Sequence, residues 1–401
     1  MINNKKKNIN SYYTNNIQIS KLKFYKIVFF IFLFLISPIL CNAEIEKDNN
    51  SLHDYKSYKL PNYITPRIRP SAVMLRDGNI LFTGGETYHS ETEGYHSDKI
   101  ETLSDSEIFN INQKKFTKTS NLNISRIDHS MALLSNGNIL VVGGFSKQMK
   151  KASKRIKTAE IYDPKNNKFN LISEMNYHMI RPNMLLLNNG DVLVFYNPNR
   201  IELFNSKENN FSIIKGLSLE KDYIRYEYIK INNNEILMYP QTYIPNETPI
   251  VKLNLNDLTL KILDIPLFDK KREYYNIAQI NEDEYLVTGG DLHAGGGYKE
   301  AKIINIKTKQ EKAVPDMHCS RYLHKSIRIN KNHIIITGGL TGANYSLKEL
   351  KDIEVYIVDE NRFKQIFHSK FAGTANYIKL QNNNYLIFKS YYQSPEILIR
   401  R

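Results

Sequence analysis

MLRDGNILFTGG, from Met74, and ALLSNGNILVVGG, from Ala132, are two copies of a phrase that occurs seven times in this 401-residue chain. Each copy has an apolar run, a polar turn with Gly, Asn or Asp, and a second run of β-branched and aromatic residues. That order is typical of a β-hairpin. The other copies read LLLNNGDVLVFYN from Leu185, YIKINNNEILMYP from Tyr228, AQINEDEYLVTGG from Ala278, IRINKNHIIITGG from Ile327 and IKLQNNNYLIFKS from Ile378.

The spacing of these hairpins predicts a circular array. Their turns are 44 to 59 residues apart, in the range of four-stranded propeller blades. Six copies are followed by a third apolar segment, a polar turn and a fourth strand, as in AEIYDPKNNKFNLI from Ala159. The pattern therefore predicts an all-β fold, a seven-bladed β-propeller. The turn residues are Gly78, Gly137, Gly190, Asn234, Asp283, Asn332 and Asn384.

The seventh copy differs because the segment PEILIRR ends at Arg401 without a fourth strand. The segment from Tyr55 to Ser71 aligns instead with the fourth-strand region of another copy, KFNLISEMNYHMIRPN from Lys168. We therefore expect an N-terminal strand, residues 55–60, to complete the last blade. A ring closed in this way leaves no open sheet edge.

The repeats resemble the kelch motif. The resemblance rests on the double glycines, the segment AEIYDPKNNKF and the Arg before each first strand, and it covers residues 55–401. It implies a kelch-type β-propeller, related to the central domain of galactose oxidases. Copies three, four and seven lack the double glycine, and Phe takes the place of the Trp usual in the family. The double glycines lie at Gly84-Gly85, Gly143-Gly144, Gly289-Gly290 and Gly338-Gly339.

Residues 1–43 are interpreted as a signal peptide, followed by a short linker over residues 44–54. Lysines precede a 14-residue apolar run, residues 27–40, which is too short to span a bilayer comfortably. Cleavage after Ala43 would export the protein to the periplasm or the medium, with no membrane span in the mature chain. Two alternatives are an uncleaved anchor and a lipid attached to Cys41.

The expected leader contains six lysines and no acidic residue, so its removal lowers the formal charge from +14 to +8. A mild positive excess suits an acidic partner. The lysines are dispersed and no nucleic-acid-binding module is recognisable, so no nucleic acid is expected as a partner. We expect a monomer.

Arginines recur at one position of the repeat. Counting eleven residues back from the turn gives an Arg in four copies, and in copies three and four an Arg lies two places later. The first strands line the central channel, so these six guanidinium groups are expected at one rim, where they would bind carboxylate, phosphate or sulfate. The alternative is that they hold loops by donating to carbonyl groups. The six are Arg67, Arg126, Arg181, Arg225, Arg272 and Arg321.

His129 and His324 follow two of these arginines and are added to the predicted ligand site. Two long loops with His89, His96 and His293 lie on the same face, but their spacing matches no zinc or calcium motif. No metal and no cofactor are therefore expected. The segment HCSRYLH, residues 318–324, is the one place that resembles the copper chemistry of galactose oxidases.

No nucleophile elbow, HExxH motif or paired cysteine motif is present, so no catalytic residue is assigned. The sequence favours an exported recognition scaffold that binds an acidic protein segment or an acidic glycan through its arginine-rich rim. The alternative is an enzyme similar to the sialic-acid mutarotases. In that case His129 and His324 would be the general acid and base.

Overall fold

The computed structural model describes residues 55–88, 100–147, 154–292, 296–342, 348–368, 375–380, 385–389 and 395–400. The predicted leader, the predicted linker, His89, His96 and His293 lie outside these residues. The described residues form β-strands and turns, and they include no helix long and apolar enough to cross a membrane.

The described strands form seven four-stranded antiparallel sheets, one for each copy of the hairpin. We call these sheets blades one to seven. Blade one contains β2 (Ser71–Met74), β3 (Ile80–Thr83), β6 (Ser106–Asn110) and β7 (Lys115–Thr119). Blade two contains β8 (Ser130–Leu133), β9 (Ile139–Val142), β12 (Ala159–Asp163) and β13 (Lys168–Leu171). Blade three contains β14 (Asn183–Leu186), β15 (Val192–Asn197), β16 (Arg200–Asn205) and β17 (Asn210–Ile214).

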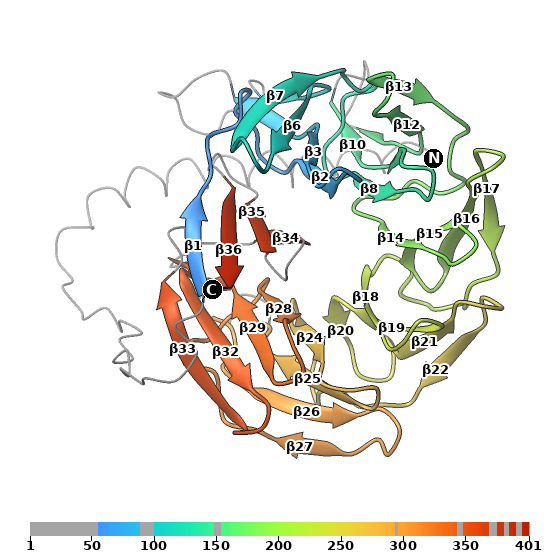
Figure 1. The fold of residues 1–401 in the computed structure, drawn as a ribbon. Helices are drawn as coiled ribbons and strands as arrows, with labels where there is room; N and C mark the ends of the chain where they lie inside the picture. Colours follow the sequence, from blue (N-terminus) through green and yellow to red (C-terminus); the bar gives the residue numbers. More distant parts are fainter. Residues whose placement is uncertain are drawn as a thin grey trace, which may run out of the picture. The chain divides into compact units, whose positions relative to one another are not determined.

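The remaining blades repeat this order. Within residues 55–400, Figure 1 shows the sheets following one another around a ring, with the first strand of each toward the centre. Blades four to seven contain β18 (Tyr226–Lys230), β19 (Glu235–Pro240), β21 (Ile250–Asn254) and β22 (Leu260–Leu263); β24 (Asn276–Gln279), β25 (Glu284–Thr288), β26 (Ala301–Asn305) and β27 (Glu311–Ala313); β28 (Lys325–Arg328), β29 (His333–Thr337), β32 (Asp352–Ile357) and β33 (Arg362–His368); and β34 (Ala375–Lys379), β35 (Tyr385–Lys389), β36 (Glu396–Arg400) and β1 (Tyr55–Lys59).

Four short two-stranded sheets lie in the connections between strands of the blades. One of them joins blade four to the segment that enters blade five. They pair β4 (Glu86–Tyr88) with β5 (Ile100–Thr102), β10 (Phe145–Ser146) with β11 (Lys154–Arg155), β20 (Thr242–Tyr243) with β23 (Arg272–Glu273), and β30 (Leu340–Thr341) with β31 (Lys348–Glu349).

The N-terminal strand closes the last blade, as the sequence predicts. Strand β1 pairs with β36 in antiparallel register, with Tyr55 opposite Arg400 and Lys59 opposite Glu396. Figure 1 shows this blue strand beside the red C-terminal one. The backbone N–H of Leu60 then donates to the carbonyl of Pro395 at 2.9 Å. Strand β36 therefore has a neighbour on both sides, β1 and β35.

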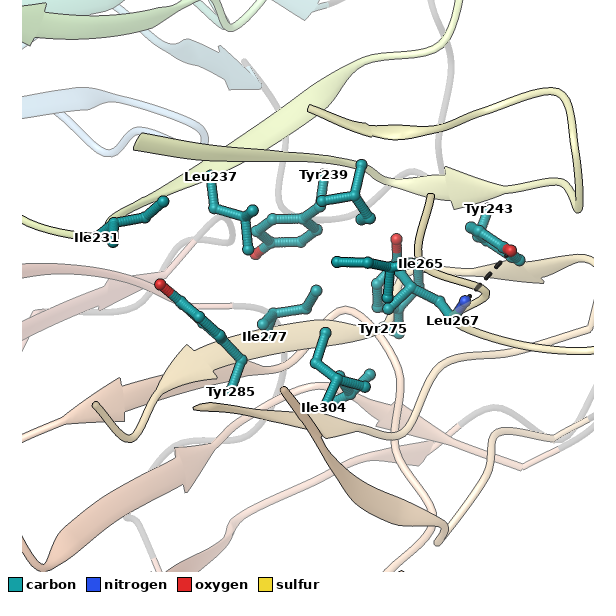
Figure 2. Close-up of a cluster of buried hydrophobic side chains, with 12 residues drawn as sticks. Ile231, Leu237, Tyr239, Tyr243, Ile265, Leu267, Tyr275, Ile277, Tyr285 and Ile304 are labelled. Atoms are coloured by element: carbon teal, nitrogen blue, oxygen red, sulfur yellow. Dashed lines mark hydrogen bonds between the residues drawn. The ribbon is translucent and has the colours of Figure 1, made fainter. Parts of the chain in front are cut away.

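The core lies between neighbouring blades, because each strand has one face toward the blade before it and one toward the blade after it. Figure 2 shows this for blades four and five, where Leu237 and Tyr239 from β19 meet Ile277 and Tyr285 of blade five. All four side chains are at most 3% exposed. Burial of such side chains contributes about 1.5–3 kcal/mol each, so the blades stabilise one another.

The double glycines lie where the connection into the next blade crosses close to the sheet. Gly84 has φ +58°, and a Cβ atom there would lie 2.3 Å from the carbonyl oxygen of Arg126. Gly289 has φ +59° and the same 2.3 Å approach to the carbonyl oxygen of Arg321. Only glycine fits both the backbone conformation and the contact, which explains the doublet.

Candidate functional site

Three of the predicted site arginines lie inside their blades. Arg67, Arg126 and Arg321 are 0% exposed, and each forms an ion pair with a Glu that is also 0% exposed. The distances are 2.7 Å to Glu107 in blade one, 2.6 Å to Glu160 in blade two and 2.5 Å to Glu354 in blade six. The same guanidinium groups donate to the carbonyls of Gly84, Gly143 and Gly338 at 2.9 to 3.1 Å.

Each of these glutamates also holds the connection that leads into the blade's first strand. Glu160 accepts the backbone N–H groups of Asn123 and Ile124 at 2.7 and 3.2 Å. In blade six, burial raises the pKa of Glu354, but the hydrogen bonds from His318 and the charge of Arg321 outweigh it and lower the pKa to about 2. The Arg–Glu pair is a structural unit that fixes the connection to the sheet.

This arrangement corrects the sequence-based site. The guanidinium groups of Arg67, Arg126 and Arg321 are turned into the blade and bonded to carboxylate and carbonyl oxygens. A side chain with no exposed surface presents no donor to a ligand in this conformation. Arg67, Arg126 and Arg321 follow the alternative given above, in which the repeated arginines hold loops by donating to carbonyl groups.

His129 and His324 are also buried, at 5% and 2% exposure. Their Nε2 atoms lie 2.6 Å from the hydroxyl of Thr83 and 2.8 Å from the hydroxyl of Thr288, so each joins its strand to the preceding blade. Burial, and then the charge of the nearby buried arginine, lowers both pKa values well below the usual 6.5. Both imidazoles are therefore buried and neutral.

These two histidines predict how stability depends on pH. The unfolded chain takes up a proton at each imidazole below about pH 6.5, whereas the folded chain does not, so stability falls as the pH falls. Each histidine should cost roughly 1.4 kcal/mol per pH unit below 6.5. Urea unfolding at pH 7.5 and 5.5 should show a smaller loss in His129→Gln than in the wild type. Equal losses in the two proteins would contradict the neutral assignment.

Arg272 takes a different position from the other arginines of its register. It pairs with Glu300 at 2.6 Å and its side chain is 12% exposed. Its guanidinium carbon lies 4.2 Å from the ring centre of Phe268 and 3.9 Å from that of Tyr298. Arg272 thus lies between two aromatic rings on the flank of blade five.

A second repeat position, nine residues before each turn, lies at or just before the start of each blade's first strand, and Figure 1 shows these first strands toward the centre of the ring. We call this end of the central channel its mouth. The backbone links neighbouring members around the ring: Arg181 N–H donates to the Asp128 carbonyl at 2.7 Å, and Leu323 N–H donates to the Tyr274 carbonyl at 3.0 Å. The Arg225 Nε donates to the Arg181 carbonyl at 2.8 Å. The described members of this ring position are Arg69, Asp128, Arg181, Arg225, Tyr274, Leu323 and Ala375.

Two predicted arginines, Arg181 and Arg225, are therefore at the mouth, and the sequence reasoning missed Arg69. Asp128 is shared by Arg181 at 2.8 Å and Arg69 at 3.4 Å. The signal that could have found Arg69 is its distance of nine residues from the turn at Gly78, which matches that of Arg181 from Gly190. Three guanidinium groups thus come from blades one, three and four.

Positive charge exceeds negative charge in this cluster. Five cationic groups share three carboxylates: Glu86 lies between Arg69 and Lys147, Asp128 between two arginines, and Glu227 between Arg225 and Lys325. Burial raises the pKa of Glu227, but its two cationic partners outweigh this and lower it to about 2. The side chain of Arg181 is 56% exposed and that of Arg69 is 31% exposed.

A cavity of about 240 Å³ lies beside Arg225, among the loops of blades three, four and five. Tyr223 and Tyr274 line it and are 63% and 37% exposed. Aromatic faces next to fixed donors are the usual composition of a small-ligand pocket. The cavity is also lined by Tyr196, Ile224, Gln241, Thr242, Ile244, Lys271 and Glu273.

Comparison with known proteins agrees with the fold. The model of the Kelch motif matches residues 132–176, which contain the second hairpin and the strands that follow it. The chain is a β-propeller that contains a kelch motif. A fungal alcohol oxidase of the AA5 family, solved with copper, matches 86% of this chain and 76% of its own at 10% identity, with a TM-score of 0.60. The structure of YjhT matches 76% of this chain and 99% of its own at 12% identity, with a TM-score of 0.49. No curated protein matches the sequence.

The residues of this propeller do not fit the copper site considered from the sequence. Tyr322 and His324 are 7% and 2% exposed, and the His324 Nε2 atom already contacts Thr288. Across the described part of the chain, no three His, Cys, Asp or Glu side chains are grouped so that they could hold a metal ion.

Proposed function

We propose that this kelch-type propeller is a recognition scaffold that binds an acidic ligand at the mouth of its channel. The observation that supports this is the cluster in which five cations share three carboxylates. The three carboxylates leave an excess of two positive charges in this cluster, so an acidic group is the complementary ligand. Arg69, Arg181 and Arg225 are the residues assigned to it.

The adjacent cavity suggests how such a ligand is oriented. Its acidic group would lie at the arginines, and its body would contact the exposed rings of Tyr223 and Tyr274. Either an acidic peptide segment or an acidic glycan has this combination of an anion and a surface that packs on an aromatic ring. Arg225 lines the cavity and belongs to the ring position, so it connects the two parts of the site.

The mutarotase-like alternative loses the residues on which it depended. His129 and His324 are buried and neutral, so neither can exchange protons with a sugar at the channel mouth. Arg181, the most exposed arginine of the mouth, has a permanently charged guanidinium group, which binds anions but is a poor general base. Recognition without catalysis is the function that this geometry supports best.

Arrays of acidic glycans and acidic peptides test the proposal. We expect wild-type protein to bind a subset of one array, and Arg181→Ala/Arg225→Ala to lose those signals. Arg362→Ala is the matched control, because Arg362 pairs with Glu360 in an exposed turn of blade six. The proposal is wrong if the double variant keeps the wild-type pattern, or if the control loses it as well.

A further inference from the structure

Blade five lacks the buried third-strand Glu that pairs with an Arg in blades one, two and six. The Glu of the third strand is Glu107 in blade one, Glu160 in blade two and Glu354 in blade six. The same position in blade five, by register and by the sequences AEIY and AKII, is Lys302. Arg272, which corresponds to the arginines that pair with these glutamates, is still present. Blade five therefore carries two cations where those blades carry an ion pair.

Among the described residues, the carboxylates that pair with these two cations are solvent-exposed. Arg272 pairs with Glu300, whose side chain is 62% exposed, and Lys302 pairs with Glu311, which is 40% exposed. Ion pairs of this kind contribute only about 0–1 kcal/mol, so an incoming anion can compete with them. The contact from Arg272 to the Gly289 carbonyl is 3.4 Å, longer than the 2.9 to 3.1 Å of the buried arginines.

The connection into blade five also lacks a carboxylate on its backbone. In blade two, Glu160 accepts the backbone N–H groups of Asn123 and Ile124. These two residues correspond to Asp269 and Lys270 in blade five. No described carboxylate accepts the N–H groups of Asp269 and Lys270. The connection is held by other means, since Leu267 is fully buried and its N–H donates to the hydroxyl of Tyr243 at 3.2 Å, as Figure 2 shows.

A cavity of about 510 Å³ occupies this place. Four cations line it, Lys270, Lys271, Arg272 and Lys302, together with three carboxylates, Asp269, Glu300 and Glu311, so positive charge exceeds negative charge by one. Val287, Ala301, Ala313 and the Phe268 ring give it an apolar wall. Its volume is within the range of small-molecule pockets. It is distinct from the cavity at the channel mouth, although Lys271 lines both.

We propose that this cavity on the flank of blade five binds a small carboxylate with an apolar or aromatic body. The carboxylate takes the place of the missing Glu: it accepts from Arg272 and Lys302 and from the backbone N–H groups of Asp269 and Lys270. The body packs against Val287, Ala313 and Phe268. Ligand occupancy thereby restores the interaction that the sequence of blade five omits.

The test compares 4-fluorobenzoate with its neutral analogue 4-fluorobenzamide by ¹⁹F NMR titration of the whole protein at constant ionic strength. We expect saturable binding of the benzoate and at least tenfold weaker binding of the benzamide. Lys302→Glu supplies the missing carboxylate from within the chain, so it should weaken benzoate binding at least tenfold and raise the melting temperature. Lys302→Gln removes the cation without filling the site and should weaken binding at least threefold.

The channel mouth is controlled separately. Arg181→Ala/Arg225→Ala should bind 4-fluorobenzoate as the wild type does, because both substitutions lie outside the lining of the blade-five cavity. Benzoate and benzamide binding alike, or benzoate binding that is unchanged in both Lys302 variants, would overturn the proposal. Loss of benzoate binding in the double arginine variant alone would place the carboxylate at the channel mouth, and would also overturn it.

Discussion

Arg126→Ala is expected to lower the free energy of unfolding by about 3–5 kcal/mol, because it leaves the buried carboxylate of Glu160 without its counter-ion. The substitution also removes the donors to the carbonyls of Gly143 and Thr158. Urea unfolding followed by circular dichroism measures the change. The same residue was predicted from the sequence to bind ligand, so a large loss of stability separates the two roles.

Two further variants make this result specific. Arg126→Met/Glu160→Gln removes both charges and keeps an amide oxygen to accept from Asn123 and Ile124, so it should recover part of the stability. Arg181→Ala, which breaks an ion pair whose arginine is 56% exposed, should change stability by only about 0–1 kcal/mol. Equal effects of Arg126→Ala and Arg181→Ala would show that burial of the pair does not matter.

Deletion of residues 55–59 should lower the melting temperature by several degrees and promote association. The deletion removes the five residues that pair with β36 and leaves that strand as an exposed sheet edge. Differential scanning calorimetry and light scattering at several protein concentrations measure the two effects. An unchanged melting temperature would mean that closure by β1 contributes little to the stability of the ring.

A synthetic peptide provides the control for this deletion. The peptide YKSYKLPN, residues 55–62, should bind the truncated protein by adding a strand to β36 and should raise its melting temperature. A peptide of the same composition in scrambled order should not. The intact protein should respond to neither, because its own β1 occupies the edge.

The fold could be predicted from the sequence because its signals are local. A turn residue between two apolar runs specifies a hairpin wherever it occurs, as at Gly78 and Gly137. The closing strand could be predicted because residues 55–71 repeat the pattern of a fourth strand. Repetition placed the four strands of each blade in register with their counterparts, so no contact between distant parts of the sequence had to be guessed within the blades.

The site could be predicted only in part, because position in a repeat does not give the direction of a side chain. Arg126 and Arg181 differ by two places in register, yet one is inside the blade and the other is exposed at the channel mouth. The carboxylate at Glu160 was visible in the segment AEIYD but was not matched to Arg126, since their pairing depends on the fold. Pairing each Arg with the Glu of its own third strand would have identified the buried set.

The dissociation constant of the strongest acidic array ligand is the most direct test of the proposed recognition site. Isothermal titration calorimetry should show that Arg181→Ala/Arg225→Ala weakens binding at least 100-fold, because two charge-assisted contacts contribute roughly 3–6 kcal/mol. Arg362→Ala should bind within twofold of the wild type. A dissociation constant within twofold of the wild type for the double variant would contradict an acidic ligand at the channel mouth.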